Sequence, residues 1–227
     1  MIISYSNNFV VIRSPKTGST SLVFYFFKSG LIDPEQDRYN IEKPFATWEE
    51  MEKEYKGHGL KRRIKRNSTT YVSSLPNIPS YFAELHSSFE ELRRKGLVDL
   101  TMSCVGTIRN PITRVASMYN YPKFFGRANI KNNPNKYWDD LKNKFKPQCD
   151  YFPDHAELFN TENLHEHVSK YILEKGGRVD RRIEMRKNPD NKLDVFLAEL
   201  TPNRKQDILD TYAKDFELWE KAYTVYN

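Results

Sequence analysis

A short turn that carries a lysine stands between two apolar stretches near the start of the chain. The turn reads SPKTGSTS (residues 14–21), and its lysine is Lys16. In the apolar run 9–12 before it, residues 10–12 favour a buried strand. Residues 19–21 suit the start of a helix whose apolar residues recur at helical spacing (Leu22, Val23, Phe26 and Phe27). A helix that begins at such a turn attracts anions, because its first backbone N–H groups have no intrahelical acceptor and lie at the positive end of the helix dipole. With the added charge of Lys16, the segment predicts a phosphate or sulfate site.

The same turn has a plainer interpretation and one departure from a common motif. Pro15 and Gly18 would also serve simply to turn the chain, with Lys16 as a solvated surface lysine. The usual nucleoside-triphosphate loop has two glycines spaced around four residues and then Lys-Ser/Thr. Here the lysine precedes the only glycine of the turn, which disfavours an ordinary ATP or GTP loop.

A second junction of this kind follows the apolar residues 102–108, which predict another buried strand. Asn110 suits the N-cap of the next helix and Pro111 suits its first position, so Arg109 is expected at the carboxyl end of the strand, where open α/β sheets bind ligands. Ser117, eight residues after Arg109, lies about two helical turns further on. A guanidinium and a hydroxyl can hold one phosphate together. Two such junctions indicate a ligand with phosphates at both ends.

Both segments resemble the cofactor motifs of the sulfotransferases. PKTGSTS (residues 15–21) resembles the 5′-phosphosulfate loop of that family, and RNPITRVAS (residues 109–117) resembles its 3′-phosphate motif. The closest resemblance is to the carbohydrate sulfotransferases of the heparan sulfate and uronyl 2-O type and their bacterial and viral relatives, in which an arginine precedes the loop as Arg13 does here. Residues 157–164 and 208–218 also look like late segments of that group, so the resemblance extends over most of the chain.

The resemblance implies a fold and an activity. The expected fold class is α/β, a single domain over residues 1–227 with a central, mainly parallel sheet flanked by helices, similar to that of P-loop NTPases. The expected activity is transfer of a sulfuryl group from 3′-phosphoadenosine 5′-phosphosulfate (PAPS) to an acceptor hydroxyl, which leaves adenosine 3′,5′-bisphosphate (PAP). Lys16 would stabilise the leaving group with Arg13 nearby, while Arg109 and Ser117 would hold the 3′-phosphate. The 5′ end of the cofactor would be bound by Lys16, Thr17, Gly18, Ser19, Thr20 and Ser21.

An acceptor hydroxyl needs a general base, and His86 is the candidate. Residues 80–85 read as a strand, and Ser87 with Glu90 reads as a capping box that opens the next helix, so His86 falls at a third strand-to-helix junction. In the resembling family a histidine in this place accepts the proton. Glu84 is the alternative base, since it lies two residues away on the same face of the strand. A histidine that only hydrogen-bonds a backbone carbonyl is the non-catalytic alternative.

We expect no metal and no disulfide framework. His165 and His167 lie in a predicted helix over residues 162–175, and side chains two residues apart do not share a helical face. The chain has two cysteines, Cys104 and Cys149, which are too few to form a zinc site alone.

The charge of the chain favours anionic partners. The formal net charge is +6 and the sequence pI is about 9.1. The basic cluster at residues 61–66 would suit an acidic polysaccharide acceptor or nucleic acid, and a solvated helix end is an equal alternative. A hydroxyl on a glycan is the acceptor that the resemblance implies, and small alcohols, lipids and peptidyl tyrosine stay open as acceptors. A nucleic-acid or heparin-binding module would give no reason for the contexts of Lys16, Arg109 and Ser117. No segment resembles a membrane span or a signal peptide, which predicts a cytoplasmic protein, and the oligomeric state stays open.

Two insertions are expected to choose the acceptor, at residues 33–79 and 122–147, because loops beside a rigid cofactor site can vary freely. Aromatic side chains in and beside the second insertion would either stack on sugar rings or pack against the body (Tyr121, Phe124, Phe125, Tyr137 and Trp138). The spacing of Ile208, Tyr212, Phe216 and Trp219 predicts a C-terminal helix that closes the core. A P-loop-like kinase and a non-enzymatic polyanion-binding module remain the alternative functions.

Overall fold

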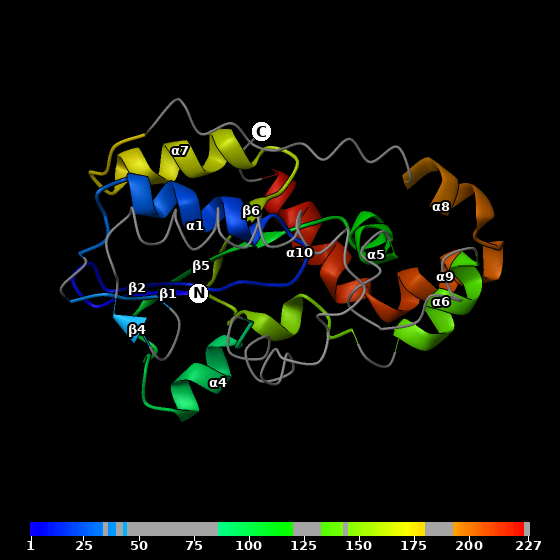
Figure 1. Cartoon of the computed structure of the whole chain (residues 1–227), viewed down its shortest axis with the longest axis horizontal. Coiled ribbons are helices and arrows are strands. Elements are labelled where there is room, and N and C mark those ends of the chain that lie inside the picture. Colours follow the sequence, from blue (N-terminus) through cyan, green and yellow to red (C-terminus); the bar gives the residue numbers. More distant parts are fainter. Residues whose placement is uncertain are drawn as a thin grey trace, which may run out of the picture.

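A sheet runs through the middle of the molecule (Figure 1). The computed structural model describes residues 1–33, 36–39, 43–44, 86–119, 133–142, 145–179 and 193–224. Within these residues the sheet has six strands in the order β4-β3-β1-β2-β5-β6. The strands are β1 (Ile2–Ser4), β2 (Phe9–Val11), β3 (Arg38–Tyr39), β4 (Lys43–Pro44), β5 (Ser103–Ile108) and β6 (Glu157–Asn160). Several predicted features lie outside the described residues: the strand at 80–85 with Glu84, the basic cluster at 61–66, and Tyr121, Phe124 and Phe125.

The α/β class is confirmed. Strand β5 pairs in parallel with both β2 and β6, whereas β1 is antiparallel to β2, so two of the three pairings among the four longest strands are parallel. The short strands β3 and β4 add an antiparallel edge next to β1. Helices α1 (Ser19–Lys28) and α7 (Leu164–Glu174) cover one face of the sheet, and α4 (Phe89–Arg94) lies on the other (Figure 1).

Alternating side chains of the strands fill the space on both faces. Val11, Val105 and Phe159 are buried against α1 and α7. Val10 and Cys104 point the opposite way and are buried with residues of α4. Successive residues of a strand face opposite sides of the sheet, and here both sides are buried. This explains why the strands show as continuous apolar runs in the sequence, at residues 9–12 and 102–108.

Four of the described helices lie beyond the end of the sheet and contribute to a second hydrophobic cluster (Figure 1). They are α5 (Pro111–Tyr119), α6 (Pro134–Leu141), α8 (Leu193–Glu199) and α9 (Pro202–Thr211). The last helix, α10 (Ala213–Thr224), packs on β5 and β6 instead, with Leu218, Trp219 and Ala222 next to Ile108 and Leu158. Trp138 and Tyr137, at 0% and 6% exposure, are buried in the second cluster, so these two aromatics of the second insertion pack against the body. None of the described helices has the length and apolar character that crossing a bilayer requires.

The chain bends where one C-terminal helix was predicted. Tyr212 has φ −114° and ψ 28°, which is not helical, and it separates α9 from α10. Its ring is buried in the second cluster, and its hydroxyl donates a hydrogen bond to the carbonyl oxygen of Phe145 at 2.9 Å. The apolar spacing was right, but this tertiary contact holds Tyr212 at a bend within it.

The capping box of α4 lies one residue later than predicted. Ser88, not Ser87, is the N-cap, and its hydroxyl accepts a hydrogen bond from the backbone N–H of Glu91 at 3.3 Å. The carboxylate of Glu91, not that of Glu90, accepts one from the N–H of Ser88 at 2.8 Å. Both Ser-x-x-Glu registers exist in the sequence. The observed one buries Phe89 and Leu92 against the sheet.

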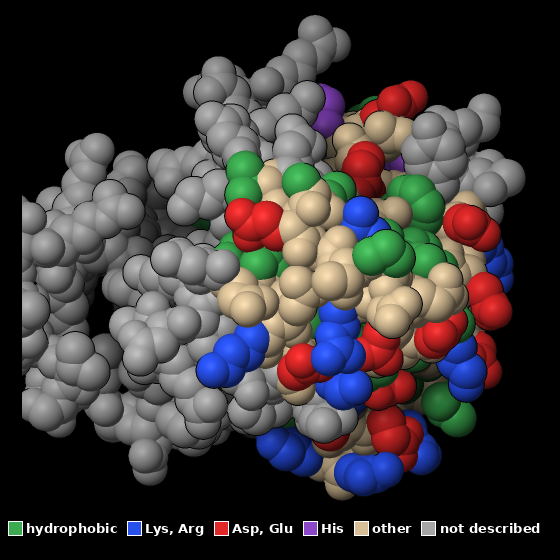
Figure 2. Space-filling view, turned by 90° about the vertical axis from the view of Figure 1, so that its right-hand side faces the viewer, with side chains coloured by type: hydrophobic (Ala, Val, Ile, Leu, Met, Phe, Trp, Pro, Cys, Tyr) green, Lys and Arg blue, Asp and Glu red, His purple; other side chains and the backbone are tan. Residues whose placement is uncertain are grey.

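Figure 2 views the molecule from the helical end, where basic and acidic side chains alternate on the surface. Arg204 of α9 pairs with Asp139 of α6 at 2.7 Å, and Lys142 pairs with Asp207 at 3.3 Å. The described part of this face therefore presents mixed charge to a polyanion.

Candidate functional site

The lysine-bearing turn lies at the carboxyl edge of the parallel strands. It connects β2 to α1, and the hydroxyl of Thr17 shares a 2.7 Å hydrogen bond with that of Thr107 in β5. Thr161, just after β6, donates hydrogen bonds to the carbonyl oxygens of both Thr17 and Ile108, at 2.9 and 2.8 Å. The turn is thereby fixed to both neighbouring strands at the edge where open α/β sheets bind ligands.

The backbone of the turn has the shape of an anion-binding helix start. Helix α1 begins at Ser19, as predicted, and the N–H groups of Ser21 and Leu22 donate to the carbonyl oxygen of Gly18 at 2.8 and 3.3 Å. The backbone N–H groups that precede these two in the helix have no acceptor within it, because no helical turn comes before them. Gly18 has φ +73°, and a Cβ there would lie 3.2 Å from Cγ2 of Thr161, so a larger residue is disfavoured.

Lys16 also adopts a left-handed backbone, with φ 66°. Non-glycine residues avoid this region, at a cost on the order of 1 kcal/mol, and hold it where the surroundings impose it. Two hydrogen bonds across the turn do so here, from the hydroxyls of Thr17 and Ser19 to the carbonyl oxygen of Ser14 at 2.9 and 3.1 Å. The hydroxyl of Ser14 itself is buried and has no hydrogen-bond partner among the described residues. Strain and buried polar groups therefore concentrate in this turn.

Arg13 and His86 meet behind the turn. The guanidinium of Arg13 donates a 2.9 Å hydrogen bond to the hydroxyl of Thr20 in the first turn of α1. Its carbonyl oxygen lies 2.6 Å from Nδ1 of His86. The structure thus brings His86 to the turn from a position 73 residues away in the chain.

The environment of His86 fixes its protonation. A carbonyl oxygen only accepts hydrogen bonds, so Nδ1 carries the proton and Nε2 of the neutral ring carries the lone pair. The pKa of His86 is lowered to about 3, first by burial and also by the positive charge of Arg13, although the hydrogen bond to the Arg13 carbonyl opposes the shift. The ring is therefore neutral at physiological pH, which is the form that can accept a proton.

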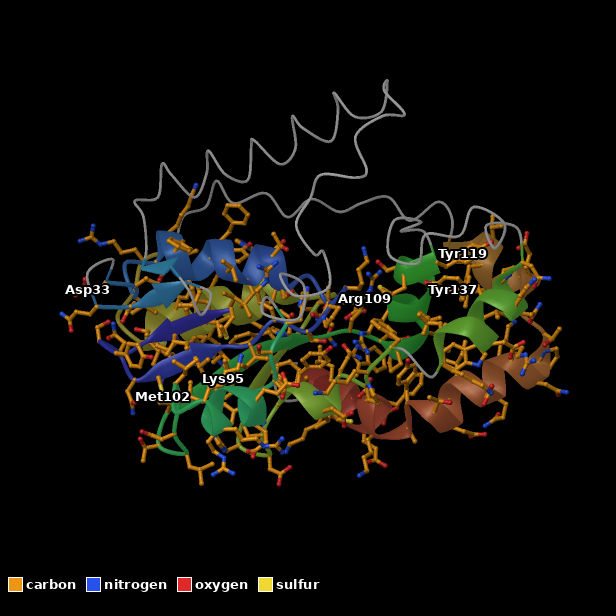
Figure 3. The ribbon with its side chains drawn as sticks, turned by 60° about the horizontal axis from the view of Figure 1, so that its bottom comes forward. Asp33, Lys95, Met102, Arg109, Tyr119 and Tyr137 are labelled. Carbon is orange, nitrogen blue, oxygen red and sulfur yellow. The ribbon has the colours of Figure 1, made fainter. Side chains whose placement is uncertain are left out.

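The second junction forms as predicted at the end of β5. The side-chain oxygen of Asn110 accepts hydrogen bonds from the N–H groups of Ile112 and Thr113 at 3.0 and 3.3 Å, and α5 begins at Pro111. Arg109 is partly exposed, and its Nε donates to the hydroxyl of Thr113 at 3.0 Å. Figure 3 shows Arg109 where the sheet meets the helices beyond it. Ser117 lies two turns further along α5 and is partly exposed.

Sequence reasoning missed the residues that connect the two junctions. Arg114 of α5 is buried, and its Nε donates to the carbonyl oxygen of Pro15 in the turn at 3.1 Å. The side chain of Gln148 bonds both backbone groups of Arg109, and Asp215 binds Gln148 in turn. Arg114 was visible within the 3′-phosphate motif but without a role. Asp215 likewise stood in a segment that resembles the family, residues 208–218, but without a role. Gln148 carried no signal, because its partner Arg109 lies 39 residues away.

The two histidines of α7 and Cys149 are titratable side chains outside the two junctions. His165 contacts the hydroxyl of Tyr25 at 2.6 Å, whereas His167 is buried on another side of α7. Burial, with Asp215 nearby, raises the pKa of the Cys149 thiol to about 12, which keeps it protonated. Among the described residues, no three histidine, cysteine, aspartate or glutamate side chains are grouped to hold a metal ion.

Comparison with known proteins found no matching family model, no matching curated protein and no matching solved structure.

Proposed function

We propose that this chain is a sulfotransferase, with the fold of the sulfotransferase family, and that it transfers a sulfuryl group from PAPS to an acceptor hydroxyl. The observation that carries the proposal is the adjacency of two anion-binding junctions. β2 and β5 are neighbouring parallel strands, with Val11 opposite Val105, and each leads at the same edge into a helix. Lys16 belongs to the first junction and Arg109 to the second, so a nucleotide with a phosphate at each end would be held across them.

The residues supply a role for each part of the transfer. Nε2 of His86 would take the proton of the acceptor hydroxyl as its oxygen forms a bond to sulfur. The bond between sulfur and the bridging oxygen breaks, and its electron pair stays on the 5′-phosphate of the product PAP. Lys16 and the amides at the start of α1 would stabilise that charge. Arg109 and Ser117 would hold the 3′-phosphate and take no part in bond breaking.

The low pKa of His86 sets the condition under which it acts as a base. A group with a pKa of about 3 is neutral but weakly basic. Negative charge nearby favours the protonated ring and raises its pKa. The charges of bound PAPS would therefore make His86 a stronger base only when the cofactor is present.

We propose an acidic glycan as the acceptor, since the chain carries a net charge of +6. A kinase is the second enzymatic candidate, and the order of Lys16 before Gly18 argues against it. A simple polyanion binder would need the charge but not the strained turn or the buried connection from Arg114 to Pro15.

The direct test is transfer of a labelled sulfuryl group from PAPS to acidic polysaccharides, measured beside phosphate transfer from labelled ATP. We expect Lys16→Ala to lower kcat, and Arg109→Ala to raise KM for PAPS with a smaller change in kcat. His86→Gln should lower kcat by about 10²- to 10⁴-fold with little change in cofactor affinity. If Glu84 were the base instead, Glu84→Gln would cause this loss of kcat and His86→Gln would not. Lys28→Ala, at the other end of α1, is the matched control and should change neither constant.

Phosphate transfer from ATP without sulfuryl transfer would support the kinase instead. Binding of polysaccharide with neither transfer would support the polyanion binder.

A further inference from the structure

A buried chain of contacts joins the two anion-binding junctions from behind. It starts at Arg114, which is 1% exposed and donates to two carbonyl oxygens, those of Pro15 and Lys146, at 3.1 Å each. Its guanidinium carbon lies 3.8 Å from the centre of the Phe145 ring, and NH1 lies 3.6 Å from the carboxylate of Asp215. Burial lowers the pKa of Arg114 only to about 10, so the side chain remains charged.

Asp215 continues the connection toward the second junction. It is 0% exposed, and its two oxygens accept hydrogen bonds from the backbone N–H groups of Gln148 and Cys149 at 2.7 and 2.8 Å. The side chain of Gln148 then accepts from the N–H of Arg109 and donates to its carbonyl oxygen, at 2.9 Å each. Gln148 therefore holds both sides of the Arg109 backbone, which sets where the Arg109 side chain starts.

The contacts fit a positioning role better than a role in stability alone. Burying an ion pair gains little net stability, because removing two charges from water offsets their attraction. This pair, however, is hydrogen-bonded at one end to the turn that carries Lys16, and its other end reaches Arg109, which would hold the far phosphate, through Gln148. A ligand with two phosphates gains affinity from both sites only when their separation matches its own length.

We propose that Asp215 is a positioning residue that, through Arg114 and Gln148, holds the Lys16 turn and Arg109 at the separation that a two-ended nucleotide requires. The inference rests on the proposed function for the identity of the nucleotide. It predicts that breaking the connection weakens the binding of PAP much more than the binding of a nucleotide with one phosphate. It also predicts that both junctions loosen together.

Two variants test this. Gln148→Met keeps the length of the side chain and the ion pair between Arg114 and Asp215. It removes both bonds to the backbone of Arg109 and the 3.3 Å bond from Nε2 of Gln148 to Asp215. Asp215→Asn keeps the shape and removes the charge. Asp37→Asn is the matched control, because Asp37 is an equally buried aspartate, 1% exposed. Within the described residues its side chain accepts four hydrogen bonds, from Ser4, Ser6 and Asp33, at the other end of the sheet.

The first measurement is the ratio of the dissociation constants of 5′-AMP and PAP, by calorimetric titration of folded protein. We expect Gln148→Met to lower this ratio by about tenfold, with less than a twofold change in 5′-AMP binding, and Asp37→Asn to leave it unchanged. A merely structural role would lower the melting temperature but leave the ratio as in the wild type, which would overturn the proposal.

The second measurement is amide hydrogen exchange without ligand, which does not depend on the identity of the nucleotide. Asp215→Asn should accelerate exchange in peptides that cover residues 9–22 and in those that cover residues 109–116. Acceleration confined to residues 145–149 and 213–217 would overturn the proposal. A wild-type protein that shows no preference for PAP, together with loosening of both junctions in Asp215→Asn, would count against the sulfotransferase while supporting the connection.

Discussion

His86 shows how the fold changes the chemistry of a single side chain. In the sequence it is a lone histidine, for which a structural hydrogen bond to a carbonyl is the simplest role, and the structure has that bond, to Arg13 at 2.6 Å. The same bond orients the ring and leaves the lone pair on Nε2. The structural and catalytic interpretations of this histidine are therefore compatible.

Burial of neutral His86 predicts a pH-dependent stability. The pKa of His86 is about 3 in the folded chain and near 6.5 when unfolded. Below pH 6.5 the unfolded chain therefore binds a proton that the folded chain does not bind, and the free energy of unfolding decreases as the pH is lowered. Well below pH 6.5 the wild type should lose about 1.4 kcal/mol of unfolding free energy per pH unit more than His86→Gln does. Urea unfolding at pH 7, 5.5 and 4.5 measures the difference. The exposed His155, replaced in the same way, serves as the control, and equal slopes for wild type and His86→Gln would contradict the prediction.

The positions of single residues in the fold were predictable where the signal was local. Lys16, Gly18, Arg109 and Asn110 each stand within a few residues of a strand end and a helix start, as expected. Asp215 could not be recognised in this way, because it accepts hydrogen bonds from residues 66 and 67 positions away and only the fold brings them together.

Helix α4 depends on a capping box whose register the sequence left ambiguous. Replacing Ser88 by alanine should lower the unfolding free energy by about 1 kcal/mol, because the N–H of Glu91 loses its acceptor. Glu91→Gln should cost less, since glutamine can still accept from the N–H of Ser88. Thermal unfolding of both variants decides the register, and a Glu91→Gln variant that is less stable than Ser88→Ala would refute it.

Strand β5 contains a glycine because an aromatic ring lies directly on it. A Cβ on Gly106 would overlap Cε1 of Phe152 and lie 2.7 Å from its Cζ. We expect Gly106→Ala to lower the unfolding free energy by about 1–3 kcal/mol, the usual range for an overpacked core. Urea denaturation measures the loss. The double variant with Phe152→Leu should recover part of it, and strictly additive losses would show that the ring is not the cause.

Elements were predicted well where hydrophobic periodicity was strong and locally capped. The strand at residues 9–12, the strand at 102–108 and the helix at 162–175 all appear, with ends that differ by a few residues. The C-terminal pattern failed to show the bend at Tyr212, because the contact between Tyr212 and Phe145 spans 67 residues. Hydrophobic periodicity predicts which face of a helix or strand is buried, but it does not predict which residues pack against that face.

At the scale of the molecule, the proposed cofactor site connects the sheet to the helices beyond it. One hydrophobic cluster lies between the sheet and helices α1 and α7, and another lies among helices α5, α6, α8 and α9. The turn with Lys16 leads into α1, whereas Arg109 leads into α5, and Arg114 of α5 donates a hydrogen bond to the carbonyl oxygen of Pro15 in the turn. The sequence predicted the α/β part from its motifs. It did not predict the helical layer as a unit, because that layer is assembled from segments between residues 111 and 212.

Titration calorimetry with PAP and with ATP, in the absence of magnesium, tests the central claim most directly. The site at the two junctions predicts that wild-type protein binds PAP tightly and ATP poorly. Arg109→Ala should weaken PAP binding by about 10- to 150-fold, since a hydrogen bond to a charged group contributes about 1.5–3 kcal/mol. Arg204→Ala, a surface arginine paired with Asp139, is the control and should bind as the wild type does. Equal affinity for PAP and ATP, or a full affinity for PAP in Arg109→Ala, would contradict the account.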